Sequence, residues 1–218
     1  MGYEAVAPPS QRRGIERPVT FVRRERFEVV AVDHRSRASL LMLRWRGDDE
    51  ARAQPPVFVA NVHLQGDPLA VETRRSQLAS VRKRLALLRE LHDVDVHSSR
   101  AVLCGDFNEP AVTALHGELT QEGGDWGPPD AWPLHDVYAE LRECPPPATF
   151  RGYGRSARID FLYRSCGLRT RSVRWPLPAE EEHRLEWSWH RWPPWPELVP
   201  CSWYASDHLP LAALFRVV

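Results

Sequence analysis

The sequence predicts a mixed α/β protein, and three features carry this prediction. Short segments rich in β-branched and aromatic residues follow one another at hairpin spacing through the first third of the chain, which favours an antiparallel or mixed sheet. An amphipathic helix pattern covers residues 71–92, with apolar side chains at spacings of three and four. Further short apolar runs follow the helix and add strands to the sheet.

The elements follow in chain order. Residues 1–18 and 47–56 are expected to be loops, and Glu25 and Arg26 form the turn of a hairpin between the first two strands. The mostly apolar segment 57–64 is expected to lie centrally in the sheet. Strands are predicted at 19–24, 27–32, 40–45, 57–64, 101–104, 159–163, 168–175 and 211–218, and helices at 71–92, 111–119 and 134–143.

Composition excludes several classes of protein. The chain has 218 residues, 43% of them hydrophobic, which is enough for the core of one domain spanning residues 1–218. Lys and Arg equal Asp and Glu, 29 each, so no overall basic charge favours nucleic-acid coating. The four cysteines form no CxxC pair, which favours a reduced intracellular protein over a zinc site. No apolar run reaches transmembrane length.

One stretch, AVLCGDFNEP at residues 101–110, concentrates the chemistry. Its apolar start predicts a buried strand, and Gly105 ends that strand and allows close backbone approach. Alternation then places Asp106 and Asn108 on one face, with Phe107 turned into the core. A carboxylate beside a carboxamide can hold Mg²⁺, orient a water or donate to an anionic oxygen. An ordinary strand and turn would use the same residue types.

Other polar residues interrupt apolar surroundings. Asp160 begins the strand 159–163, where a carboxylate must be paired or bind metal, unless it faces solvent at a frayed end. Asp207 and His208 stand directly before the last apolar strand. The basic side of helix 71–92 is a solvated face, or presents one or two arginines to an anionic substrate. Residues 176–204 form a loop excursion rich in Trp and Pro, whose aromatic rings pack on the domain or stack on bases.

In this order, the motifs NVHL, GDFN, IDFLY and SDHLP resemble the endonuclease/exonuclease/phosphatase superfamily. The segment NVHLQGDP, the following helix with Arg75 and Gln77, and SDHLPLAALF are most similar to its deadenylase, nocturnin and Angel-like branch. The resemblance implies a four-layer α/β sandwich with two mixed sheets. It also implies a Mg²⁺- or Mn²⁺-dependent phosphoesterase, such as a 3′–5′ exoribonuclease or deadenylase. Fold alone does not choose the substrate among RNA, DNA, a dinucleotide and other phosphoesters.

The resemblance also implies the roles of individual residues. His63 stabilises the transition state at the scissile phosphate, and Asp106 orients or deprotonates the attacking water. Asn108 donates to a phosphate oxygen. Asp160 joins the same cluster, and His208 serves the phosphate. Catalytic roles are thus expected for His63, Asp106, Asn108, Asp160 and His208, substrate contacts for Asn108, His63 and Thr149, and metal binding for Asp207 and Asp106.

The chain departs from the family pattern at its start. The family begins with an Asn-bearing strand, a helix and a strand ending in Gln-Glu, whose Glu is the main metal ligand, and Glu4 does not stand in that context. We therefore expect either an N-terminally truncated enzyme or a catalytically inactive relative that binds RNA or protein. The expected partner is single-stranded RNA or a nucleotide-like phosphoester, and the expected protein is a monomer, cytoplasmic or nuclear and not membrane-bound.

Overall fold

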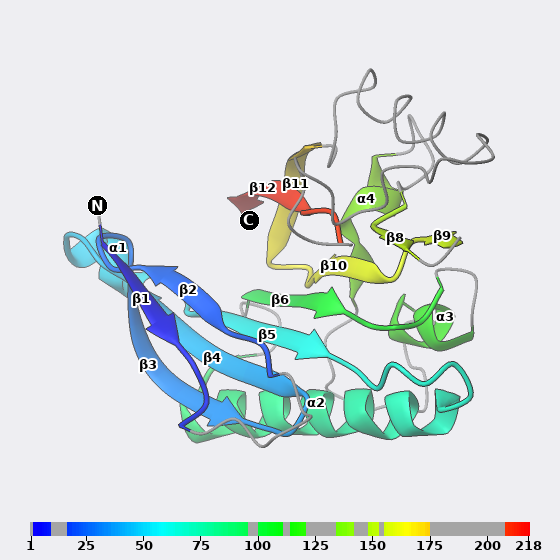
Figure 1. The fold of residues 1–218 in the computed structure, drawn as a ribbon. Coiled ribbons are helices and arrows are strands. Elements are labelled where there is room, and N and C mark those ends of the chain that lie inside the picture. The colour runs from blue at the N-terminus through cyan, green and yellow to red at the C-terminus, as the bar shows by residue number, and fades with distance from the viewer. Residues whose placement is uncertain are drawn as a thin grey trace.

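A six-stranded mixed sheet organises the computed structural model, which describes residues 2–9, 17–95, 100–110, 114–120, 134–141, 148–152, 155–174 and 208–218 (Figure 1). In spatial order its strands are β3 (Phe27–His34), β4 (Ala38–Trp45), β5 (Val57–His63), β6 (Arg100–Asp106), β10 (Asp160–Arg164) and β7 (His135–Asp136). The pair β5–β6 is parallel, and the other pairs are antiparallel. The predicted mixed sheet and the interior place of β5 are therefore confirmed.

Smaller elements surround this sheet. Three two-stranded pairs are β1 (Tyr3–Val6) with β2 (Thr20–Arg23), β8 (Phe150–Gly152) with β9 (Arg155–Ala157), and β11 (Leu168–Arg174) with β12 (Ala212–Val217). The helices are α1 (Asp49–Ala53), α2 (Val71–Leu91), α3 (Ala114–Thr120) and α4 (Val137–Glu140). None of the helices among the described residues is long and apolar enough to cross a membrane.

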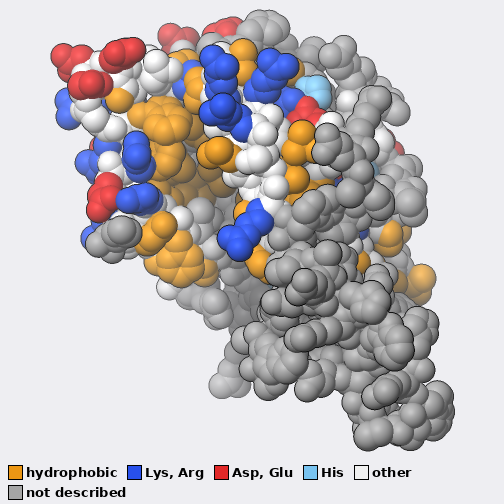
Figure 2. Space-filling model, turned by 90° about the horizontal axis from the view of Figure 1, so that it is seen from above, with side chains coloured by type: hydrophobic (Ala, Val, Ile, Leu, Met, Phe, Trp, Pro, Cys, Tyr) orange, Lys and Arg blue, Asp and Glu red, His pale blue; other side chains and the backbone are white. Residues whose placement is uncertain are grey.

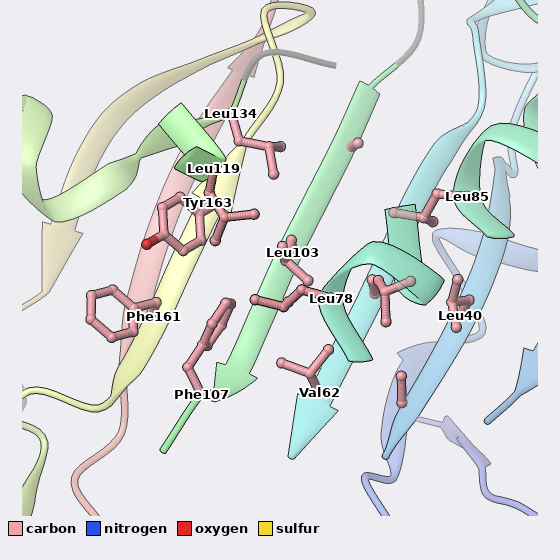
Figure 3. Close-up of a cluster of buried hydrophobic side chains, with 14 of the residues drawn as sticks. Leu40, Val62, Leu78, Leu85, Leu103, Phe107, Leu119, Leu134, Phe161 and Tyr163 are labelled. Carbon is pink, nitrogen blue, oxygen red and sulfur yellow. The ribbon is translucent and has the colours of Figure 1, made fainter. Parts of the chain in front are cut away.

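The main core lies between the sheet and helix α2. Leu78, Val81 and Leu85, which belong to the apolar pattern predicted for this helix, are all buried in the core cluster. Figure 3 shows Leu78 and Leu85 facing Leu40, Val62 and Leu103 of β4, β5 and β6. Leu91, at the end of the pattern, is 78% exposed, whereas Leu88 and Val94 on either side of it pack against the core. Phe107 is fully buried in this core, as predicted, so the chain after β6 is anchored beside the polar residues that flank it.

The β1–β2 pair covers part of the opposite face. Val6 and Val22 pack against Leu41, Leu43 and Val57 of β4 and β5, so β4 is buried on both faces. Figure 2 looks onto this side of the molecule and shows hydrophobic side chains gathered around a hollow. Exposed large hydrophobic residues on β1, β2, β3 and β12 are Tyr3, Phe21, Val32 and Leu214.

Four local predictions are corrected. Residues 3–6 are a strand rather than a loop, because they pair with β2. For the same reason β2 does not pair with β3: the turn at Glu25 connects them, but their partners are β1 and β4. The expected loop 47–56 contains helix α1, which the Asp48 side chain caps by accepting from Ala51 N. The expected helix 134–143 begins as strand β7, and α4 covers only Val137–Glu140 of it.

Candidate active site

Three predicted site residues stand side by side at one edge of the sheet. His63 ends β5, Asp106 ends β6 and Asp160 begins β10. The register pairs His63 with Asp106 across the parallel strands, and Asp106 with Asp160 across the antiparallel ones. Cross-strand partners point to the same face of a sheet, so the three side chains meet on one side. Strand alternation puts them on the face opposite α2, since Val62 and Phe161 point into the core.

Asp106 is the centre of the cluster. Its Oδ2 atom lies 3.7 Å from Nε2 of His63 and 3.9 Å from Nε2 of His208. The Asp106 side chain is 14% exposed, and the two imidazoles are 29% and 30% exposed. One largely buried carboxylate therefore lies between two imidazoles that solvent and ligands can reach.

His208 enters the site from the far end of the chain. Its Nδ1 atom lies 2.8 Å from Oδ2 of Asp160, and its backbone forms an isolated bridge with Phe150. The Phe150 ring also packs on the imidazole, with 5.3 Å between ring centroids. These contacts bring residue 208 beside residues that lie 48 or more positions earlier. They also fulfil the prediction that Asp160 is paired rather than facing solvent at a frayed strand end.

Asn108 holds the carboxylate of Asp106 in place. Its backbone N donates to Asp106 Oδ1 at 2.7 Å, and its Nδ2 donates to Asp106 Oδ2 and to Leu64 O, each at 3.0 Å. Asn108 adopts φ of +49°, a left-handed conformation that Asn tolerates better than most residues. Both amide hydrogens are thus used within the protein, so donation to a phosphate would require Nδ2 to leave one of these partners.

Gly105 allows β5 and β6 to approach closely, as the sequence predicts, but it does not end the strand as expected, because β6 continues to Asp106. Its φ is +125°, and a Cβ atom there would lie 2.0 Å from the carbonyl oxygen of Val62. Only glycine fits this backbone conformation and this space. The register of His63 beside Asp106 therefore depends on the missing side chain at position 105.

Thr149 occupies a different place from the one expected. It is fully buried, so it does not offer the substrate contact that we predicted for it. Its Oγ1 atom accepts from the backbone N of Ile159 and of Asp160, at 3.1 and 2.9 Å. Its carbonyl oxygen accepts from Leu209 N at 2.7 Å. Thr149 therefore fixes the start of β10 and the approach to His208 from behind the site.

A buried ion pair, which the sequence reasoning missed, joins the two turns of the site. Arg74 of α2 and Glu109 are each 2% exposed, with Nε and Oε2 2.5 Å apart. The Arg74 guanidinium also donates to the carbonyls of Gln65, Asp67 and Pro68. It therefore ties the turn after His63 to the residue that follows Asn108. The buried Arg74 fits neither role expected for the basic side of α2, which was a solvated face or a contact with an anionic substrate. Arg75, by contrast, pairs with Glu72 and Glu118 at the surface.

Aromatic residues pack behind the site. His116 of α3 contacts the hydroxyl of Tyr163 through Nδ1, and its Nε2 lies 3.2 Å from the carbonyl oxygen of Glu109. Burial lowers the pKa of His116 below its usual range. The rings of Phe107 and Phe161 pack edge to face, with centroids 5.4 Å apart. A neutral imidazole satisfied on both sides thus belongs to the scaffold that holds Glu109.

The structure brings together His63, Asp106, Asn108, Asp160 and His208, while Asp207 and segment 176–204 lie outside the described residues. Within the described part of the chain, no three His, Cys, Asp or Glu side chains are arranged to hold a metal ion. The catalytic and metal-binding roles of these residues stay predictions.

No protein-family model and no curated protein matches the sequence. Solved structures do match its fold. ANGEL2, a 2′,3′-cyclic phosphatase solved with adenosine-2′,3′-vanadate, matches with a TM-score of 0.73 at 18% identity, over 99% of this chain and 75% of ANGEL2. The human Nocturnin catalytic domain, with bound sulfate, matches with a TM-score of 0.61 at 17% identity, over 91% of this chain and 63% of Nocturnin.

A third match carries the superfamily's name. It is the endonuclease/exonuclease/phosphatase from Bacteroides vulgatus, with a TM-score of 0.53 at 15% identity, over 92% of this chain and 70% of that protein. The chain has the endonuclease/exonuclease/phosphatase fold. The resemblance drawn from NVHL, GDFN, IDFLY and SDHLP is therefore confirmed for this fold. The first three motifs lie at the ends of the adjacent strands β5, β6 and β10, and His208 of the fourth contacts Asp160 of the third.

Proposed function

We propose that this protein is a metal-dependent phosphoesterase that cleaves phosphodiester bonds, of the 3′–5′ exoribonuclease or deadenylase type. The observation that carries the proposal is the position of Asp106 between His63 and His208, with Asp160 bonded to the second imidazole. A carboxylate between two imidazoles offers a proton acceptor and two donors within a few ångströms. The fold shared with ANGEL2 and Nocturnin supports the same proposal.

The residues of the chain divide the work. Asp106 orients a water at the strand end and accepts its proton as the water attacks phosphorus. His63 and His208 place N–H groups where negative charge develops on the phosphate oxygens. Asp160 holds Nδ1 of His208, which leaves Nε2 directed toward Asp106 and the substrate. Asn108 fixes both oxygens of Asp106 and so sets the direction of its remaining lone pairs.

The donor set suits a hard cation. Mg²⁺ is held in proteins by one or two carboxylates and keeps several waters, so it does not need a complete cage of side chains. Asp106 would be one ligand and Asp207 the second. The bound cation would supply positive charge that stabilises the pentacoordinate phosphate and the leaving oxygen.

Two observations favour the alternative, an inactive relative that binds RNA or protein. The described residues offer no group of three metal-binding side chains, and both oxygens of Asp106 already accept hydrogen bonds from Asn108. In that case the site would bind a phosphoester without cleaving it. Measuring hydrolysis distinguishes an active phosphoesterase from an inactive binding protein.

The layers of the fold, the class of substrate and the cellular location of the protein are part of the same proposal. We infer a single domain with a four-layer sandwich, in which the β1–β2 and β11–β12 pairs belong to a second sheet. The substrate is single-stranded RNA or a nucleotide-like phosphoester, and the protein acts as an intracellular monomer. The nucleotide ligand of ANGEL2 supports a nucleotide-like substrate.

The test is hydrolysis of short oligoadenylate and of bis-(p-nitrophenyl) phosphate, with Mg²⁺, with Mn²⁺ and with EDTA. Activity should require the metal and should fall at least about 100-fold in Asp106→Asn. This variant keeps an oxygen that accepts from Asn108, so its melting temperature should stay near that of the wild type. Asp33→Asn, on β3 away from the site, is the matched control. Binding of oligoadenylate without any turnover would favour the inactive relative instead.

A further inference from the structure

Arg37 lies beside His63 at the edge of the sheet that carries the site. The backbone N of His63 donates to the carbonyl oxygen of Arg37 at 3.0 Å. The next pair in the register is Ala38 with Val62, and both of these side chains point into the core under α2. Arg37 directly precedes β4 and its carbonyl oxygen still pairs with His63, so the alternation continued by one residue places Arg37 with His63 on the opposite face, the one that carries the site.

The charge of Arg37 is not neutralised within the described residues. Its Nη2 atom donates to Oε1 of Gln65 at 2.8 Å, and Gln65 is a neutral amide. No ion pair joins Arg37 to a carboxylate of the described part of the chain. Arg35 on the same turn differs, since its guanidinium lies 3.9 Å from Oδ1 of Asp33.

Gln65 is held in place from the other side. Its backbone N donates to Oε1 of Gln77 at 3.0 Å, and its carbonyl oxygen accepts from Nη1 of the buried Arg74 at 3.0 Å. The partner of Arg37 is thus part of a braced turn two residues after His63. The bond to Gln65 restrains the guanidinium near that turn while the remaining N–H groups keep their donors for a ligand.

The spacing matches a second phosphate. Neighbouring strands lie about 4.8 Å apart, so the backbone of Arg37 lies about 10 Å from that of Asp106, with His63 between them. An extended arginine side chain covers much of that distance. A phosphate bound between His63 and Asp106 would therefore have its neighbouring phosphate within reach of Arg37.

We propose that Arg37, together with Gln65, forms a second anion subsite that binds the phosphate next to the scissile one. The proposal rests on the proposed function, because that function defines the scissile phosphate. It narrows the substrate class to phosphoesters with at least two phosphate groups, such as an oligonucleotide. Arginine suits this task because its planar guanidinium offers paired donors to phosphate oxygens.

The experiment compares ligands that differ by one phosphate. Calorimetry in EDTA, where no turnover is expected, gives dissociation constants for the dinucleoside monophosphate ApA and for pApA and ApAp, which carry one more terminal phosphate. The wild type should bind pApA or ApAp about fivefold to tenfold more tightly than ApA. Raising the salt concentration should shrink that preference, because ions screen exposed charges.

Arg37→Gln should remove the preference and leave the affinity for ApA unchanged. Glutamine can still donate to Gln65, so the variant removes the charge and keeps the hydrogen bond. Arg35→Gln is the matched control, with the same loss of charge two residues away, and should keep the preference. Arg37→Lys retains the charge and should keep part of the preference for the extra phosphate. This second variant replaces Arg37→Gln in the comparison if circular dichroism shows that Arg37→Gln is unstable.

Equal binding of all three ligands by the wild type would overturn the subsite, as would an equal loss in Arg35→Gln and Arg37→Gln. Hydrolysis in Mg²⁺ is scored separately. If ApA is cleaved but the extra phosphate gives no tighter binding, the subsite is wrong and the phosphoesterase stands. If pApA or ApAp is preferred through Arg37 but no ligand is cleaved, the subsite stands and the phosphoesterase is wrong.

Discussion

The Nδ1 atom of His208 lies 2.8 Å from Oδ2 of Asp160, at the edge of the sheet where β10 begins. This contact fixes the direction of the imidazole, because a ring held at Nδ1 presents Nε2 to the opposite side. Asp160 is itself fixed, since its backbone N donates to the buried Thr149 hydroxyl. The contact with Asp160 therefore restrains the His208 side chain relative to the start of β10, although that side chain is 30% exposed.

Asp160→Asn should reduce hydrolysis by at least about 100-fold, by analogy with the loss of a carboxylate that orients a catalytic histidine. The amide removes the negative charge that stabilises a protonated His208 and no longer fixes which ring nitrogen carries the proton. Thermal melting should change little, because the backbone bond to Thr149 remains. Full turnover in this variant would show that the orientation of His208 does not matter for the reaction.

Breaking the Arg74–Glu109 pair should lower stability strongly. Arg74→Met leaves Glu109 buried without a partner, and removing one member of a buried pair lowers the free energy of unfolding by about 3–5 kcal/mol. Arg74→Met combined with Glu109→Met removes both charges and should recover a large part of that loss. Urea unfolding of the wild type, the two single variants and the double variant gives the coupling directly.

Arg75→Met is the control for this cycle. Arg75 is 35% exposed, and its partners Glu72 and Glu118 are also accessible, so the change should stay within about 1 kcal/mol. If Arg74→Met lowered the free energy of unfolding as little as Arg75→Met, the Arg74–Glu109 pair would not hold the two turns of the site rigidly together.

Gly105→Ala should separate the two parallel strands of the site. Its Cβ would lie 2.0 Å from Val62 O, and the φ of +125° is itself unfavourable for alanine by about 1–3 kcal/mol. Both stability and activity should fall together. Gly66→Ala is the matched change, because its nearest neighbour would be Oδ1 of Asn108 at 3.6 Å, an ordinary contact. A well-folded, active Gly105→Ala protein would contradict the close approach of β5 and β6.

His116 should make stability depend on pH. Burial lowers its pKa in the folded state below the ordinary value of 6.5, so the unfolded chain binds a proton first as the pH falls. The contribution of neutral His116 is thus present above pH 6.5 and is lost below it, at up to about 1.4 kcal/mol per pH unit. Urea unfolding from pH 7.5 to 5 should show a steeper decline for the wild type than for His116→Gln. Parallel curves would exclude this origin.

The residues that meet at the candidate site could be predicted from the sequence better than the elements around them. Asp106, Asp160 and His63 could be predicted because each is a polar residue at an end of an apolar strand, and the family resemblance distinguished them from ordinary turn residues. Their meeting also follows from strand order, since parallel and antiparallel neighbours bring those ends to one edge. His208 stands out beside Asp207 before the last apolar strand, but only the family resemblance joined it to the other site residues, because its partner Asp160 lies far away in sequence.

Other features depend on tertiary contacts that no local pattern records. Residues 3–6 become a strand only because β2 offers its edge. Arg74 has the same local sequence character as Arg75, yet it is buried because Glu109 and three carbonyls meet it there. Thr149 was placed on the substrate side, although a hydroxyl serves equally well to cap the start of β10.

The wide separation of the site residues has a consequence for biosynthesis. His63, Asp106, Asp160 and His208 are separated by 106 − 63 = 43, 160 − 106 = 54 and 208 − 160 = 48 positions. Contacts so distant require large loops to close, which slows folding. A nascent chain that has emerged from the ribosome as far as Arg164 contains all of β4, β5, β6 and β10, yet it lacks His208. The sheet can therefore form before the candidate site is complete, and on refolding we expect the recovery of β-structure to precede the recovery of the proposed activity.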